Sequence, residues 1–173
     1  MEGLFPCNRR DFIRFASMAG VGATPLAALS EPSTKSAAHA GLKFYIFSKH
    51  LQFLDYLDMS GVAKEMGFDG IDLTVRPNGH VLPENVAEDL PAATEAMKSF
   101  GLSTNMLTTK VLDADDRLDR KVLETASQNG YKVYRPGWYR YSREKQIQKS
   151  ARAFGERLRA LGLLGEDLGI SGS

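Results

Sequence analysis

Apolar and polar side chains alternate along residues 69–76. The alternating positions run in the order Ile71, Asp72, Leu73, Thr74, Val75 and Arg76. This period of two predicts a β-strand with one apolar and one polar face. A turn of Pro77, Asn78 and Gly79 then presents His80. The strand therefore ends in a polar loop, and the meaning of that loop depends on the sheet to which the strand belongs.

The rest of the chain repeats strand and helix. Apolar runs predict strands over 42–48, 69–75, 102–109 and 131–137, with a further extended segment over 170–173. Stretches of helical spacing lie between them, over 53–67, 85–101, 113–130 and 142–169. The first three helical stretches end at a glycine, as helices commonly do. Pro91 indicates that the main part of the second helix begins near that residue.

A short strand directly after each helix predicts right-handed βαβ units and a parallel sheet. The strands recur about every 30 residues, which matches a TIM barrel, in which eight units take about 250 residues. We therefore predict an α/β fold with parallel (β/α) repeats of a TIM barrel over 41–173. About four units are present, which makes a partial barrel. A doubly wound open sheet is the alternative, but the glycine-rich turn that often follows its first strand is absent from residues 48–51.

Polar residues on one side of a parallel strand are unexpected, because parallel sheets are normally covered on both faces. In a barrel this side points into the interior, whose carboxyl-end mouth holds the active site. Polar residues of the strands and of the loops that follow them are thus candidates for substrate binding: His50, Asp72, Arg76, His80, Arg135 and Trp138. Several of them also have a structural interpretation. Asp72 and Arg76 would form an internal ion pair, His80 would bond a backbone carbonyl, and Trp138 would serve in packing.

Residues 1–40 have the pattern of an export signal. Arg9 and Arg10 precede Phe12, a mildly apolar stretch follows, and the segment ends in small residues around Ala40. The paired arginines resemble the twin-arginine type. We expect cleavage after Ala40, recognition by the twin-arginine translocation machinery and a periplasmic location. An uncleaved anchor and a short amphipathic helix are the alternatives.

The charge balance excludes some partners. Lys and Arg number 22 against 21 Asp and Glu, so the chain has no basic excess of the kind that binds nucleic acid. The single cysteine, Cys7, lies in the predicted signal, which leaves residues 41–173 without a thiol ligand or nucleophile. No metal-binding spacing such as H-E-x-x-H and no G-x-S-x-G motif is present.

Two segments resemble the sugar phosphate isomerase/epimerase family, whose fold is the xylose-isomerase-like barrel. They are GFDGIDLTVRPNGHVLPENV, residues 67–86, and YKVYRPGWYRY, residues 131–141. The resemblance covers residues 41–173 but only the N-terminal half of the family's barrel. It implies metal-assisted proton transfer beside the carbonyl of a sugar or sugar phosphate.

The family's divalent metal, which is Mn, Mg, Zn or Co, is held by residues of strands five to eight. The resemblance therefore implies no metal ligand and no catalytic residue in this chain, only the six substrate-binding candidates. We expect the chain to be an inactive part of a longer enzyme. Its alternative is a homo-oligomer in which two copies complete a barrel. The alternative functions are a periplasmic carbohydrate-binding module and a barrel lyase or hydrolase acting on sugar-like substrates.

Overall fold

A computed structural model describes residues 41–141 and 147–173, in which five short strands alternate with helices. The strands are β1 (Tyr45–Phe47), β2 (Gly70–Val75), β3 (Ser103–Thr109), β4 (Val133–Arg135) and β5 (Ser171–Gly172). The α-helices are α2 (Tyr56–Glu65), α3 (Val86–Ser99), α4 (Arg117–Gln128) and α5 (Ile147–Leu168). Two 3-10 helices, η1 (Ser48–Leu51) and η2 (Pro83–Asn85), follow the first two strands.

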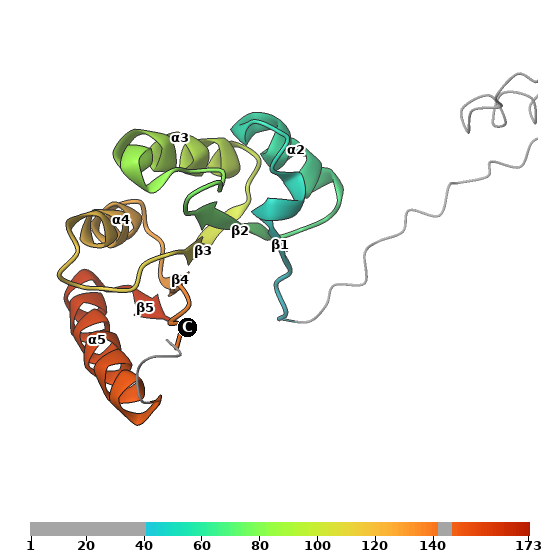
Figure 1. The fold of residues 1–173 in the computed structure, drawn as a ribbon. Coiled ribbons are helices and arrows are strands. Elements are labelled where there is room, and N and C mark those ends of the chain that lie inside the picture. The colour runs from blue at the N-terminus through green and yellow to red at the C-terminus, as the bar shows by residue number, and fades with distance from the viewer. Residues whose placement is uncertain (1–40, 142–146) are drawn as a thin grey trace, which may run out of the picture. The chain divides into compact units, whose positions relative to one another are not determined.

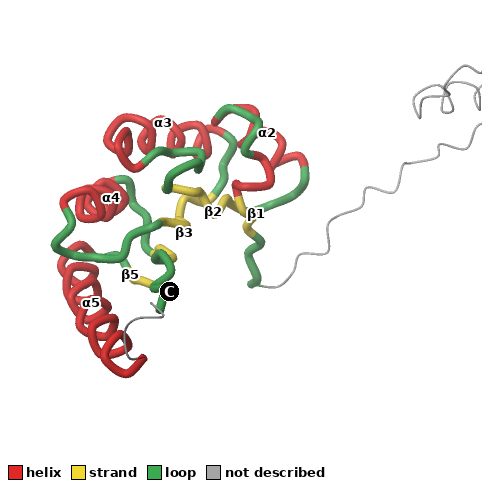
Figure 2. Tube along the Cα trace, viewed as in Figure 1, coloured by secondary structure: helices red, strands yellow, loops and turns green. Residues whose placement is uncertain are grey.

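All five strands are parallel and pair in chain order, β1-β2-β3-β4-β5. Figure 1 shows the helices on the outer side of this sheet, with α2, α3, α4 and α5 following one another along it. Figure 2 shows the same arrangement by element type, with the strands enclosed by the arc of helices. The sequential parallel order confirms the predicted (β/α) repeats of a partial TIM barrel.

The two faces of the sheet differ in polarity, as the alternation in β2 predicts. Ile71, Leu73 and Val75 are at most 1% exposed and pack in the core beneath the helices. The parallel register continues this apolar face through Leu107 of β3 and Tyr134 of β4. The opposite face carries the polar residues of the same strands, namely Asp72, Thr74, Thr108 and Arg135. This polar face is the one that would line a barrel interior.

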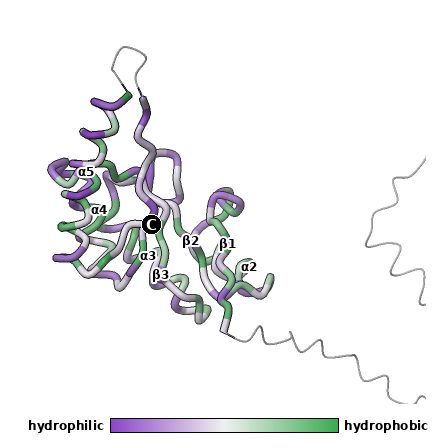
Figure 3. Tube along the Cα trace, turned by 90° about the horizontal axis from the view of Figure 1, so that it is seen from below, coloured by the Kyte–Doolittle hydropathy of each residue, from purple (hydrophilic) through white to green (hydrophobic). Residues whose placement is uncertain are grey.

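The helix boundaries follow from local chemistry. Asp55 and Asp116 cap α2 and α4 by accepting hydrogen bonds from backbone N–H groups of the first turn. α3 differs from the prediction, because it begins at Val86 and carries Pro91 inside the helix. The 3-10 turn Pro83–Asn85 leads directly into it and starts the helix one turn earlier than Pro91 alone indicated. Hydrophilic and hydrophobic turns alternate along α5 in Figure 3, and its buried side includes Leu161 and Leu164.

Several sequence predictions lie outside the described residues. Residues 1–40, with Arg9, Arg10 and Phe12, are among them, so export and the boundary at Ala40 stay predictions. The predicted start of the fourth helix at 142 also falls in an undescribed segment, 142–146. Within the described ranges, no helix has the length and apolar content needed to cross a bilayer.

Gly70 of β2 lies between its register partners, Tyr45 of β1 and Ser103 of β3. A Cβ atom at this residue would lie 2.7 Å from the carbonyl oxygen of Ser103 and would also collide with the ring of Tyr45. The β2–β3 register is irregular directly after it, between Gly70 and Asp72. Only glycine therefore allows the three strands to approach at this point.

We predict that Gly70→Ala lowers the free energy of unfolding by roughly 1–3 kcal/mol, because backbone must move to accept the methyl group. Gly155→Ala is the matched control, since nothing lies within 4 Å of a Cβ there and the residue lies within α5. That change should stabilise the protein by about 0.5–1 kcal/mol. Unfolding of each variant in urea measures the change in the free energy of unfolding. Equal effects of the two variants would contradict the assigned packing of Gly70.

Candidate functional site

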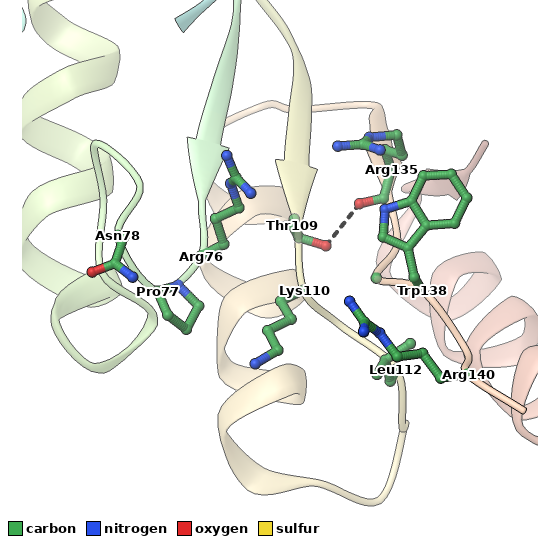
Figure 4. A pocket seen from close by; sticks show the side chains of 10 residues that line it. Arg76, Pro77, Asn78, Thr109, Lys110, Leu112, Arg135, Trp138 and Arg140 are labelled. Atoms are coloured by element: carbon green, nitrogen blue, oxygen red, sulfur yellow. Dashed lines mark hydrogen bonds between the residues drawn. The ribbon is translucent and has the colours of Figure 1, made fainter. Parts of the chain in front are cut away.

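A cleft of about 340 Å³ opens where β2, β3 and β4 end. Figure 4 shows it from close by. Its lining comes from the last residues of β3 and β4 and from the loops after the three strands, and consists of Arg76, Pro77, Asn78, Thr109, Lys110, Leu112, Arg135, Gly137, Trp138 and Arg140. This is the edge of a parallel β/α sheet at which ligands bind.

The cleft is positively charged. Four cationic side chains line it, and no carboxylate does: the cations are Arg76, Lys110, Arg135 and Arg140. The two salt bridges found among the described residues, Arg120–Glu124 and Arg157–Asp113, involve none of them. Arginines that line a concave site without a carboxylate in its lining suit a carboxylate or phosphate ligand, which a guanidinium group can bind through two parallel hydrogen bonds.

Arg135 is joined to Asp72 through Thr108, and the three residues belong to three neighbouring strands. The Thr108 hydroxyl donates to Oδ2 of Asp72 at 2.9 Å. Nε of Arg135 donates in turn to Oγ1 of Thr108 at 3.4 Å. Burial raises the pKa of the Asp72 carboxyl, while the hydrogen bond from Thr108 and the charge of Arg135 oppose that rise. We call this set the Asp72–Thr108–Arg135 relay.

The predicted ion pair between Asp72 and Arg76 does not form. The two residues are four positions apart in β2 and the loop that follows, a span of roughly 13 Å in an extended chain. Asp72 is instead paired with Thr108, and Nε of Arg76 is buried without a hydrogen bond. The interior carboxylate is therefore connected to Arg135 through Thr108, and Arg76 lines the cleft.

The loop after β4 is held against the loop after β3. Thr109 donates its hydroxyl to the carbonyl of Arg135 at 2.9 Å, and the N–H of Gly137 donates to Val111 at 2.9 Å. A Cβ atom on Gly137 would lie 2.9 Å from the carbonyl oxygen of Lys110. The glycine thus permits a close approach of the two loops, and this approach places the residues that follow it at the cleft.

Trp138 gives the cleft an aromatic surface. Its side chain is 75% exposed, and Cζ of Arg135 lies 5.7 Å from the centroid of its ring. This distance is within the range of a cation–π interaction. An exposed indole beside a guanidinium offers a flat apolar face next to a positive charge. A sugar ring that carries an anionic group matches both features.

His80 faces the protein rather than the cleft. Its loop folds back on β2, since the backbone N–H of His80 donates to Oγ1 of Thr74 at 3.0 Å and Tyr56 donates its hydroxyl to the His80 carbonyl at 3.1 Å. The imidazole nitrogens are buried and make no hydrogen bond of ordinary geometry. The ring lies near the carbonyls of Leu51 and Leu54. This environment is the one expected for a structural histidine.

The structure brings three of the six predicted site residues together. Arg76, Arg135 and Trp138 line the cleft, whereas Asp72 lies behind Arg135 in the relay. His50 is exposed on η1, with its ring edge-on to Phe47, and does not line the cleft. The cleft adds Lys110 and Arg140 to the predicted set. The sequence feature that could have identified Lys110 and Arg140 is their position in loops that follow strands.

The described residues do not fit a metal ion. Within 41–141 and 147–173, no three His, Cys, Asp or Glu side chains gather into a group that holds a metal. The lining of the cleft is cationic, and a cation would be repelled there. The chemistry that these residues support by themselves is the binding and orientation of an anion.

We predict that His80 makes the fold less stable in mild acid. Burial lowers its pKa below the ordinary value of 6.5 in the folded chain. Between the two pKa values the unfolded chain binds more protons, so stability falls as the pH drops through 6.5 towards the folded pKa. His80→Gln should flatten the change of Tm with pH in this range.

The exposed His50 provides the matched control variant, His50→Gln. Scanning calorimetry at several pH values gives the curves, and the difference between each variant and the unchanged chain isolates one histidine. If His80→Gln leaves the slope as it was, then the buried placement of the ring is wrong.

Comparison with known proteins supports the fold. The sequence matches no protein family profile and no curated protein. Among solved structures it resembles the probable 3-DHS dehydratase AsbF, involved in petrobactin synthesis, from Bacillus anthracis, with a TM-score of 0.55 and 14% identity over 76% of this chain and 51% of that one. A D-tagatose 3-epimerase-like protein gives a TM-score of 0.53 and 14% identity over 76% and 52%. The chain thus spans about half the length of each of these two proteins, and the likeness is one of fold, that of a partial TIM barrel.

Proposed function

We propose that this chain forms the substrate-binding half of the mouth of a sugar isomerase or epimerase, and that the substrate carries an anionic group such as a phosphate ester. The observation that carries the proposal is the cleft at the carboxyl ends of β2, β3 and β4. It combines four cationic side chains with one exposed indole. The resemblance of the fold to an epimerase-like barrel supports the choice of reaction.

In this proposal the described residues bind the substrate and orient it. Arg135 and Arg76 hold the anionic group, Lys110 and Arg140 close the cleft with further positive charge, and Trp138 covers one face of the sugar. An anchored anion fixes the position of the carbonyl end of the sugar relative to the rest of the mouth. Such anchoring by a part of the substrate that does not react contributes to catalysis by orientation.

The proton transfer itself requires residues other than these. A base must take a proton from the carbon beside the carbonyl, and the enediolate that forms needs a positive partner. A divalent metal supplies that charge in the family that the sequence resembles. The described residues do not fit such a metal, so we assign no step of the reaction to it. The metal stays a proposal for the complete barrel.

Water elimination is the second candidate reaction, and the fold resemblance to a dehydratase favours it. Epimerisation and elimination from a hydroxycarbonyl compound can both begin with loss of a proton beside the carbonyl. They differ in product, because epimerisation keeps every atom of the sugar and elimination releases water. The same cleft would serve either reaction, so product analysis must separate them.

We predict that the cleft discriminates by charge. The 173-residue chain should bind a ketose phosphate more tightly than the same ketose without phosphate, and added salt should weaken only the phosphate ester. Trp138 is the only tryptophan and lines the cleft, so its fluorescence reports binding. Arg135→Met should weaken binding of the ester by about tenfold or more, because a charge-assisted hydrogen bond contributes about 1.5–3 kcal/mol.

Arg152→Met is the matched control variant, since Arg152 is an exposed residue of α5 that does not line the cleft. It should bind the ester as the unchanged chain does. Equal affinity of the unchanged chain for the ester and the neutral sugar would contradict an anionic substrate.

We predict that the reaction exchanges one carbon-bound proton with solvent. In deuterium oxide, a ketose phosphate should gain deuterium at the carbon beside the carbonyl when it is incubated with the protein that is encoded by the reading frame containing this chain. NMR of the recovered sugar measures the exchange. Deuterium in an epimer or isomer supports the proposal, and an unsaturated product supports elimination. Saturable binding without exchange would instead indicate a carbohydrate-binding module.

A further inference from the structure

The relay beneath the cleft has only one hydrogen-bonding direction. A hydroxyl group carries one proton and two lone pairs, whereas a guanidinium only donates and a carboxylate only accepts. Thr108 therefore gives its proton to Asp72 and accepts from Nε of Arg135. With Thr108 buried at 0% exposure, water does not compete for this hydroxyl. The order Arg135 to Thr108 to Asp72 is fixed by the chemistry of the three groups.

The relay holds one edge of the Arg135 guanidinium. The parallel register places Thr108 directly beside Arg135, and Trp138 lies near its Cζ atom on another side. The backbone of Arg135 is held separately, because Thr109 donates to its carbonyl. Figure 4 shows Arg76 and Arg135 on either side of the end of β3. With Nε engaged, the two terminal nitrogens of Arg135 are the ones left for a ligand.

Asp72 does not line the cleft, and its hydrogen-bond connection to Arg135 runs through Thr108. We propose that Asp72 and Thr108 are positioning residues that fix Arg135 for an anion, so that they determine the preference of the cleft for anionic over neutral ligands. This inference rests on the proposed anionic ligand. It adds two residues that touch no ligand and assigns them a role in specificity.

Positioning and simple electrostatics predict opposite effects at Asp72. A negative charge near the cleft repels an anion, so its removal should strengthen anion binding if charge alone matters. If Asp72 holds Thr108, and Thr108 holds Arg135, then loss of the acceptor should weaken anion binding although the repulsion is gone. An arginine left without its anchor loses more side-chain entropy when it binds.

The experiment uses the 173-residue chain and inorganic phosphate as the probe. Titration at about pH 8 is followed by Trp138 fluorescence, with a neutral ketose as the second ligand. Thr108→Val removes the hydroxyl and keeps the shape, so phosphate should bind about tenfold more weakly, a change equivalent to one relay hydrogen bond to a charged group. Thr108→Ser restores the hydroxyl and should return affinity to nearly that of the unchanged chain.

Affinity for the neutral ketose should be the same in all these variants, which a general loss of structure would not allow. Thr104→Val is the matched control, because Thr104 lies in β3 and outside both the relay and the cleft. It should leave phosphate binding as it is. Thermal melting of each variant verifies that the chain is folded.

A second pair of variants decides the matter if Thr108→Val does not fold. Asp72→Asn removes the charge and keeps an oxygen acceptor, so phosphate should bind at least as tightly as before. Asp72→Leu removes both, and phosphate should bind more weakly. Tighter binding in both variants would overturn the positioning role and leave only charge repulsion.

The experiments distinguish a failure of this inference from a failure of the proposed function. If the unchanged chain binds phosphate and Thr108→Val binds it equally well, the relay has no positioning role, whatever the reaction. If the relay variants behave as expected but no solvent exchange occurs, the proposed reaction is wrong and the anion site stands. If the unchanged chain does not bind phosphate at all, both proposals fall.

Discussion

The parallel direction of all strands is the constraint on which the rest depends. Because every strand enters the sheet from the same end, the loops that leave β2, β3 and β4 meet at one edge. The register then pairs side chains of the same face across strands, which places Thr108 beside Arg135. The cleft and the relay each combine residues from three separate segments of sequence. Both result from the parallel direction of the strands.

The sheet also separates stability from recognition. Its apolar face is covered by helices and supplies the core, so Ile71, Leu73 and Leu107 hold the strands together without entering the cleft. The polar face carries the relay, and the loops beyond it carry the positive charge. Substitutions on the two faces should therefore have different consequences. Changes in the core alter how much protein is folded, and changes in the polar face alter what the folded protein binds.

The sequence allowed the fold and part of the cleft to be predicted, for physical reasons that differ between elements. The period-two pattern of β2 identified both of its faces, because side chains alternate across a strand. Arg76, Arg135 and Trp138 were found because they lie at or just after the carboxyl ends of strands. The alternative interpretation of Asp72, an ion pair with Arg76, does not hold, since a pairing within one strand is visible in a sequence and a hydrogen bond to Thr108 of another strand is not. His80 faces inward because its loop folds back on Thr74, a feature that no short-range pattern encodes.

The exposed indole of Trp138 has a thermodynamic consequence. At 75% exposure it keeps a large apolar surface in water, beside the guanidinium of Arg135. A ligand that covers the ring removes that surface from water, and burial of apolar surface gives binding a negative change in heat capacity. The enthalpy of binding should thus become more favourable as temperature rises. Contact of the same ligand with the arginines alone would produce little of this effect, so heat capacity distinguishes stacking on the indole from capture by charge.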